Sequence, residues 1–395
     1  MRRNRTAIII VTLVTLLLIA LPLHRTGSAN AVISFLVPSL ATMAIFAVIC
    51  IGLNIQWGYT GIFNFGVAAF FMIGAYTAAI VTKAPADGEF ATYIGGFGEA
   101  LSAAPLPGAS QWLPFLIAVL AAVVVSALLA LLLAWPTVRL REDYLAIMLI
   151  GAAEVLRRIA TEERWLVNGS RGLGGIPRPF AGVVDSDSYR YLFLLLTAIL
   201  VVLAYVLAER GIRSPWGRVL RAIREDEEAA AAAGKNVVAF KLQGFVLGAA
   251  VMGAGGAFYA FQQGAISPDT FTHFFGTFIL WAMLITGGSG NMVGAMVGVY
   301  VIWGLWSTTL QLQGYELPAF VAGRIPHIRD TLVGLTIVAV LLVNPGGLLP
   351  EQARVSRWLD RRVAAMRRSE QLVGESERRP SPLADLPTPD SPTSV

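Results

Sequence analysis

Residues 112–135 read WLPFLIAVLAAVVVSALLALLLAW, and this stretch decides the fold class. It contains no charged side chain, and its two ends are tryptophans, Trp112 and Trp135. An α-helix rises about 1.5 Å per residue, so the stretch would measure about 34 Å, enough to cross the hydrocarbon core of a bilayer. Tryptophan favours the boundary between membrane and water. The sequence therefore predicts a membrane-spanning helix anchored at both interfaces.

The composition of the whole chain supports this prediction. Of its 395 residues, 56% are hydrophobic and only 14% are charged, and the mean hydropathy is +0.66. An average soluble domain has roughly 45–50% apolar and about 25% charged residues. Water-soluble enzyme folds are therefore excluded. The net charge of +5 does not indicate nucleic-acid binding, because the basic residues gather in short loops and at the chain ends, where a bilayer orients them.

Further apolar stretches recur along the chain. They lie near residues 7–23, 31–53, 58–82, 144–160, 191–208, 237–262, 276–288, 292–311 and 328–343. Two are irregular: 144–160 carries Glu154, Arg157 and Arg158, and 276–288 is shorter than the roughly 20 residues that a bilayer requires. The sequence predicts an all-α polytopic membrane protein with about eight to ten transmembrane helices.

Basic residues set the expected orientation, because short cytoplasmic loops are enriched in lysine and arginine. With the N-terminus inside, the cytoplasmic segments hold Arg2, Arg3, Arg5, Arg139, Arg141, Arg210, Arg213, Arg218, Arg221, Arg224 and Lys235. The predicted outer loop 83–111 holds one lysine, whereas the outer loop 161–190 holds four arginines. The start of the chain, RRNR before an apolar run and SANA, also fits a signal peptide, whose removal would leave the remaining topology unchanged.

The last part of the chain differs in composition. From Glu351 onward it contains paired arginines and then RRPSPLADLPTPDSPTSV, which offers too little apolar surface to offset the entropy of ordering. We expect residues 1–350 to form the transmembrane domain, with a cytoplasmic loop at 209–236. Residues 351–395 are expected to form a cytoplasmic, largely disordered tail.

Motifs for catalysis, metal binding and nucleotide binding are absent from the sequence. No GxxxxGK[ST] phosphate-binding loop occurs, and the nearest match, AAAGKN, lacks the first glycine and the hydroxyl residue. The three histidines lie in separate loops without a second ligand at metal-binding spacing, and the single cysteine, Cys50, lies in an apolar stretch. We therefore expect no catalytic residue, no metal, no cofactor and no ATP hydrolysis by this chain.

The most informative polar stretch is RSPWGRVLRAIREDEEAAAAAGKNVVAFK, residues 213–241. Pro215 can open a helix, the five alanines from Ala229 to Ala233 favour helix, and Gly234 permits a left-handed C-cap. Alanines let another backbone approach closely, and the neighbouring acidic residues offer charges to a partner. The same composition also fits a solvated cytoplasmic helix without a partner.

These residues carry a resemblance to a known family. Glu227, Ala229, Ala230 and then Gly234 resemble the EAA loop of ABC importer permeases, which docks into a groove of the ATPase subunit. The flanking blocks resemble LivM-type permeases of branched-chain amino acid importers: GLNIQWGYTGIFNFGVAAFFMIGAYTAAI, DYLAIMLIGAAEVLRR, VNGSRGLGGIP, VVAFKLQGFVLGAAVMGAGGAFYAF with ISPDTF, ITGGSGNMVGAMVG and NPGGLL. The resemblance runs from about Ile51 to Leu349. It implies that the ATPase-coupling residues are Arg224, Glu227, Glu228, Ala229, Ala230 and Gly234.

Polar residues inside the apolar stretches are candidates for a substrate path, because an unpaired polar group in hydrocarbon is costly. The candidates are Asn54, Gln56, Asn64 and Glu154. Hydrogen bonding between helices is the alternative role of the three amides. Glu154 can also form a structural ion pair with Arg157 and Arg158, three and four residues further along the helix.

The resemblance implies a multi-pass permease subunit of the bacterial cytoplasmic membrane that is not itself an enzyme. The implied partners are a second permease, two ATP-binding subunits, an external solute-binding protein, the amino-acid substrate and membrane lipid, with no nucleic acid. The glycine-rich loop Asn168–Pro177 is expected either to meet the solute-binding protein or to be an ordinary loop. A permease for urea or short amides, or a stand-alone secondary transporter, is the alternative function.

Overall fold

The computed structural model of the protein describes residues 2–88, 91–103, 109–137, 142–180, 184–313, 315 and 318–351. Seven helices in these ranges are long and apolar enough to cross a membrane, and the most hydropathic is the predicted helix Trp112–Trp135. Two shorter apolar helices, Val67–Thr82 and Phe274–Gly287, bring the total to nine, within the expected eight to ten. The predicted tail lies outside the described residues except for Glu351, and so do Arg139 and Arg141.

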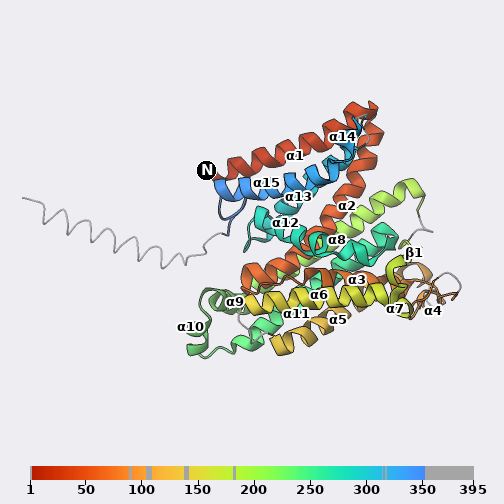
Figure 1. Ribbon diagram of the computed structural model, residues 1–395. Helices are drawn as coiled ribbons and strands as arrows, with labels where there is room; N and C mark the ends of the chain where they lie inside the picture. Colours follow the sequence, from red (N-terminus) through yellow and green to blue (C-terminus); the bar gives the residue numbers. More distant parts are fainter. Residues whose placement is uncertain are drawn as a thin grey trace, which may run out of the picture. The chain divides into compact units, whose positions relative to one another are not determined.

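The long helices run back and forth between the two ends of the bundle (Figure 1). They are α1 (Arg2–Thr26), α2 (Ala29–Asn54), α5 (Ala109–Thr137), α6 (Glu142–Glu162), α8 (Ser186–Arg213), α11 (Val237–Gln263), α13 (Met292–Leu312) and α15 (Ile325–Val343). The shorter helical elements are η1 (Ile55–Tyr59), α3 (Val67–Thr82), α4 (Gly98–Ser102), α7 (Arg164–Val167), η2 (Gly169–Arg171), α9 (Pro215–Glu225), α10 (Glu227–Ala232), η3 (Pro268–Phe271), η4 (Phe274–Phe278), α12 (Ile279–Gly287) and α14 (Ala319–Ala322).

Helix α11 is the centre of the core and packs against α2, α3 and α5. Its small residues make this possible. A Cβ added at Gly253 would lie 2.2 Å from Ser126 Oγ of α5, and one added at Gly74 of α3 would lie 2.2 Å from Gly253 O. The glycines of α11 therefore allow close packing between helices. Cys50 lies in the same core and is fully buried.

One apolar stretch is not the continuous helix that hydropathy suggests. Residues 58–82 were expected to form one span, but α2 ends in the π-helical turn η1, residues 60–66 are not helical, and α3 begins only at Val67. Gly61 has a positive φ of 79° and the chain turns there, a conformation that glycine adopts readily. We call residues 60–66 the break.

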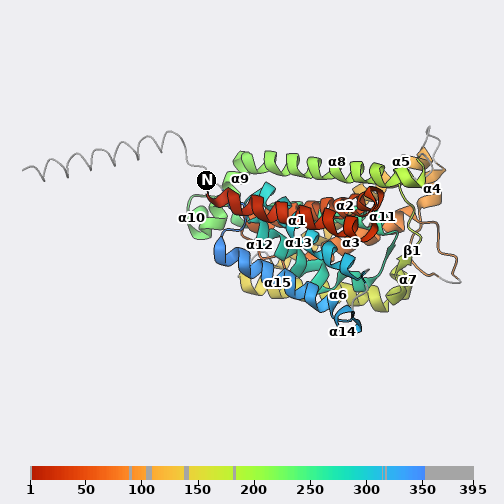
Figure 2. The ribbon, with the colours of Figure 1, turned by 90° about the horizontal axis from the view of Figure 1, so that it is seen from above.

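The two ends of the bundle carry the loops that the charge pattern separates. The N-terminus, α9 and α10 lie at one end, and α4, α7 and the strand β1 (Leu173–Gly174) lie at the other, in Figure 1 and again in Figure 2. At the outer end, β1 pairs antiparallel with β2 (Ala265–Ile266), with Leu173 opposite Ile266. This pairing joins the loop after α6 to the end of α11.

Candidate functional site

The predicted coupling loop folds into two short helices with defined caps. Pro215 occupies the first turn of α9, and the Asp226 carboxylate accepts a 2.9 Å hydrogen bond from the Ala229 N–H at the start of α10. At the end of α10, Gly234 has a φ of 76°, its N–H donates to Ala231 O, and the Lys235 N–H donates to Ala230 O. This pair of bonds is a Schellman C-cap. The predicted helix start and left-handed cap are both confirmed.

The six residues assigned to coupling differ in exposure. Ala230 is buried in a small cluster with Ile223 and Val237, which holds α10 against α9 and the start of α11. Glu228, Ala229 and Gly234 are exposed at the tip. Glu227 forms an ion pair with Lys241 of α11, whose side chain is mostly buried. The tip therefore exposes small residues and the carboxylate of Glu228, while the Glu227–Lys241 ion pair fixes its base to α11.

Arg224 connects the coupling loop to the break. Its guanidinium donates a hydrogen bond to Gly58 O in η1, and its Cγ lies within 3.1 Å of the position of a Cβ added at Gly61. Arg224 Nη2 also forms a 2.8 Å ion pair with Glu351 Oε2. A side chain of the coupling loop thus touches both sides of the point where the helix is interrupted.

The three candidate amides are fully buried and bonded around the same break. Gln56 Nε2 donates to Phe245 O of α11 at 2.7 Å, and Asn64 Nδ2 donates to Gln56 Oε1 at 2.7 Å. The Gly66 N–H donates to Asn64 Oδ1, and the Gly290 N–H donates to Asn54 Oδ1. These bonds match the helix-to-helix role that the sequence left open.

An aromatic cluster, consisting of Trp57, Phe63, Phe65 and Trp281, lines the break. The Phe65 and Trp281 rings stack at 4.8 Å between centroids, and Phe63 and Trp281 stack at 6.1 Å. Trp281 Nε1 donates a 2.9 Å hydrogen bond to Asn64 O. Trp57, Phe63 and Phe65 keep part of their surface exposed. The break therefore presents an apolar aromatic wall.

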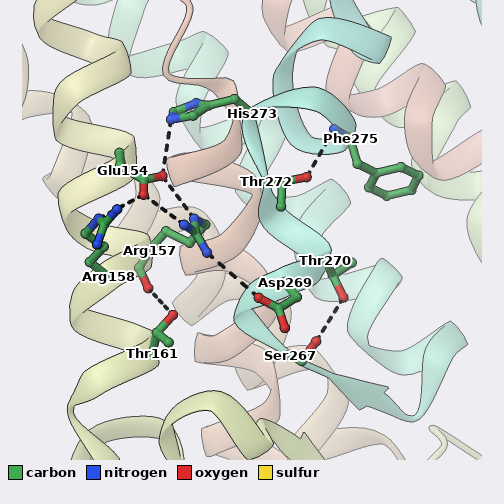
Figure 3. A network of polar contacts seen from close by, with 10 residues as sticks. All are labelled: Glu154, Arg157, Arg158, Thr161, Ser267, Asp269, Thr270, Thr272, His273 and Phe275. Atoms are coloured by element: carbon green, nitrogen blue, oxygen red, sulfur yellow. Dashed lines mark hydrogen bonds and ion pairs between the residues drawn. The ribbon is translucent and has the colours of Figure 1, made fainter. Parts of the chain in front are cut away.

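Glu154 lies in a cluster of charged residues between α6 and the segment η3–η4 (Figure 3). Its carboxylate accepts two hydrogen bonds from Arg157 (Nη2 at 2.8 Å, Nε at 3.0 Å) and one from Arg158 (Nε at 3.0 Å). His273 Nε2 lies 3.3 Å from Glu154 Oε2, and Asp269 Oδ1 lies 3.9 Å from Arg157 Nη1. We call these five residues the charged cluster.

The sequence predicted only part of the charged cluster. The ion pairs of Glu154 with Arg157 and Arg158 are confirmed and follow from their spacing on one helix. Asp269 and His273 were missed, because they approach Glu154 only through the fold. The polar run SPDTFTH between two apolar stretches, residues 267–273, was the available signal.

The glycine-rich outer loop is held by the loop before α4. Thr92 N–H donates to Asn168 Oδ1 at 3.2 Å, Ile94 N–H donates to Leu166 O at 3.1 Å, and Lys83 Nζ donates to Gly174 O. Burial lowers the pKa of the Lys83 ammonium at this contact. A hollow of about 570 Å³ lies between the two loops and is lined in part by Thr92, Glu162, Arg164, Trp165, Asn168 and Arg171.

Metal chemistry has no support in the described part of the chain, where no group of three or more His, Cys, Asp or Glu side chains could hold an ion. The arrangement instead consists of the loop that carries Arg224 in contact with a broken helix, with buried amides and aromatic rings around the break.

A family model described as "Branched-chain amino acid transport system / permease component" matches residues 35–341. The chain belongs to this family. The match includes the break, the charged cluster and the whole coupling loop, whereas Glu351 lies beyond it. The assignment as a multi-pass protein of the bacterial cytoplasmic membrane agrees with the seven long apolar helices among the described residues.

Individual permeases of this kind resemble the chain over most of its length. It is 30% identical to the high-affinity branched-chain amino acid transport system permease protein LivM of Salmonella typhimurium, over 79% of this chain and 69% of the relative. It is 26% identical to the probable branched-chain amino acid transport permease protein LivM of Methanocaldococcus jannaschii, over 82% of this chain and 96% of the relative. The permease protein LivH of Salmonella typhimurium is 24% identical over 78% and 93%. No solved structure matches the chain at a significant level.

Proposed function

We propose that this permease is a membrane-spanning subunit of an ATP-binding-cassette importer that moves branched-chain amino acids into the cell. Its partners are a second permease, two ATP-binding subunits that hydrolyse ATP, and an external solute-binding protein. The observation that carries the proposal is the contact of Arg224 with Gly58 and Gly61, because it connects a cytoplasmic loop directly to an interrupted membrane helix.

The coupling loop is the docking element for an ATP-binding subunit in this proposal. Glu228, Ala229 and Gly234 form the exposed tip, and Glu227 and Ala230 fix the tip to α11 and α9. Closure of the ATP-binding subunits displaces the tip, and Arg224 passes the displacement to the break. Alternating access requires such an element with two arrangements that a distant ligand can bias.

The substrate path follows the break and the charged cluster. Asn54, Gln56 and Asn64 hold the broken backbone in place, and Glu154 organises the charged cluster on the outer side of it. The partly exposed rings of the aromatic cluster suit an aliphatic side chain. The relatives' names and this apolar wall favour branched-chain amino acids over urea or short amides, which carry more polar surface for their size.

The solute-binding protein docks on the outer hollow. Arg164 and Arg171 are exposed at its rim beside Trp165, and the hydrogen bonds to Thr92 and Ile94 hold the loop in shape. Arginine and tryptophan are enriched where protein interfaces concentrate their binding energy.

Co-purification tests the coupling role. The tagged permease is expressed with its ATP-binding subunits, and a variant with Glu227→Lys, Glu228→Lys and Gly234→Val should lose them. The matched control is Glu99→Lys, Glu162→Lys and Gly88→Val at the outer end, since Gly88 shares with Gly234 a φ of 76° and open space around its Cβ position. Equal recovery with both variants would refute the proposed docking, and urea uptake without leucine uptake would overturn the substrate.

A further inference from the structure

The charged cluster has features that a purely structural ion-pair network does not need. The helix that carries Glu154, α6, also exposes apolar residues: Ile147 is 68% exposed and Val155 is 57% exposed, while the exposed charged residues Asp143 and Glu162 lie at its two ends. Ionised groups at membrane depth face a water-filled path or a protein partner rather than lipid. The surface of α6 and η3–η4 that carries the cluster therefore borders water or another subunit.

Within the charged cluster, the Glu154 carboxylate has no further capacity to accept hydrogen bonds. A carboxylate accepts about four hydrogen bonds, and Glu154 receives three from Arg157 and Arg158 and a fourth contact from His273. Glu154 is therefore a positioning residue that fixes the two guanidiniums.

Two other members of the charged cluster keep exposed polar atoms that can bind a ligand. The Asp269 side chain is 80% exposed, and its 3.9 Å approach to Arg157 exceeds the length of a hydrogen bond. The Arg158 side chain is 71% exposed and, among the described residues, it uses only Nε, which leaves both terminal nitrogens of the guanidinium open. Figure 3 shows Arg158 and Asp269 on opposite sides of the Glu154–Arg157 pair.

We propose that the charged cluster is a binding site for the zwitterionic end of an α-amino acid, with the ammonium on Asp269 and the carboxylate on Arg158. The inference rests on the proposed function and specifies its substrate contacts. A free amino acid carries one positive and one negative group on the same carbon, so it can bridge an open carboxylate and an open guanidinium held by one ion pair. Planar guanidinium suits a carboxylate because it can donate two parallel hydrogen bonds.

The aliphatic side chain of the ligand points inward, toward the break. Seven residues before Glu154 on α6 lies the exposed Ile147, and five residues after His273 on η4 lies Phe278, which is 50% exposed. Phe278 contacts Phe65 of the aromatic cluster, with ring centroids 6.1 Å apart. Each of the two elements that carry the charged cluster thus exposes an apolar side chain, and Phe278 connects η4 to the aromatic cluster. Urea would use neither the charges nor these apolar side chains.

Cysteine protection tests the site, since the single native cysteine, Cys50, is fully buried and gives a silent background. The variant Ile147→Cys is made in the full importer with its partner subunits, in right-side-out membrane vesicles. The modification rate by a charged, membrane-impermeant thiosulfonate is measured with leucine, with isocaproate, which lacks the ammonium, and with isoamylamine, which lacks the carboxylate. We expect leucine to slow the modification of Cys at position 147. Isocaproate, isoamylamine and urea should leave the modification rate unchanged. Leu128→Cys on α5, similarly exposed at 59%, should show no protection by leucine.

Substitutions in the Ile147→Cys background test the two contacts. Arg158→Gln and Asp269→Asn each remove one charge-assisted contact while keeping the Glu154–Arg157 pair, and should raise the leucine concentration for half-protection about tenfold or more. The control Arg324→Gln removes an exposed arginine whose guanidinium donates to Phe320 O and lies over the Phe320 ring, far in sequence from the charged cluster. Its leucine concentration for half-protection should stay within about twofold of the parent.

The outcomes separate this inference from the function on which it rests. Leucine uptake by the wild-type importer without protection at residue 147, or protection that survives both substitutions, overturns the site alone. Absence of leucine uptake by the wild type overturns the function itself. Equal protection by isocaproate overturns the ammonium contact and leaves a carboxylate site in its place.

Discussion

Replacing Arg224 by alanine should uncouple transport from ATP hydrolysis. A hydrogen bond from a charged donor such as Arg224 to Gly58 O contributes roughly 1.5–3 kcal/mol, and a partly exposed ion pair such as that with Glu351 contributes up to about 1 kcal/mol. The two side chains of the pair are 24% and 32% exposed, so we take the lower part of the combined range, about 2 kcal/mol. That amount biases a two-state equilibrium by about thirtyfold.

The assay is leucine uptake and phosphate release in the same proteoliposomes containing the purified importer. We expect Arg224→Ala to lower leucine transported per ATP hydrolysed by at least about tenfold, with ATP hydrolysis itself within about twofold of wild type. Arg224→Lys should be intermediate, because one ammonium replaces a planar group that reaches Gly58 and Glu351 together.

The matched control is Arg324→Ala, which also removes an arginine that donates to a backbone carbonyl, that of Phe320, but at the start of α15. This control should keep the wild-type ratio of leucine transported to ATP hydrolysed. If Arg224→Ala assembles with the ATP-binding subunits and keeps the wild-type ratio as well, Arg224 does not transmit the displacement and the argument fails.

Two other substitutions test the local structure. The added methyl of Gly234→Ala meets no atom within 4 Å, so the substitution costs only the strain of the left-handed backbone, about 1–2 kcal/mol. In hydrogen–deuterium exchange mass spectrometry the Lys235 amide should then exchange roughly tenfold faster. Unchanged exchange would contradict the cap. Asn64→Ala leaves the buried Gln56 Oε1 and Gly66 N–H without their partners, which should cost about 1–3 kcal/mol and lower the midpoint of thermal unfolding in nanodiscs, whereas an unaltered midpoint would show that the amide bonds do not hold the break.

The elements that the sequence predicted well depend on local signals. The span Trp112–Trp135 is an uninterrupted apolar run, and the cap at Gly234 follows from an alanine run ended by glycine. The pairs of Glu154 with Arg157 and Arg158 follow from the three- and four-residue spacing of a helix. The cap and the ion pairs depend on residues within one or two helical turns, and the span depends on one continuous run of 24 residues.

The break and the completed charged cluster depend on signals that the sequence does not show. Hydropathy reports that residues 58–66 are apolar, but it does not report whether their backbone is helical. Distant partners hold the break and the turn before it: Trp281 donates to Asn64 O within the break, while Gln56 donates to Phe245 O and Gly58 O accepts from Arg224 just before it. Asp269 likewise reaches Arg157 across more than a hundred residues of chain, so spacing alone could not pair them.

The short strand pairing between β1 and β2 has a consequence for how this end of the bundle can move. Leu173 and Gly174 pair with Ile266 and Ala265, and Lys83 donates a hydrogen bond to Gly174 O. The ends of α3, α6 and α11 on this side of the bundle are therefore joined to one another. These helix ends cannot separate unless the backbone hydrogen bonds between β1 and β2 break. In any movement that keeps the strand pairing intact, the ends of α3, α6 and α11 on this side of the bundle therefore move as one body.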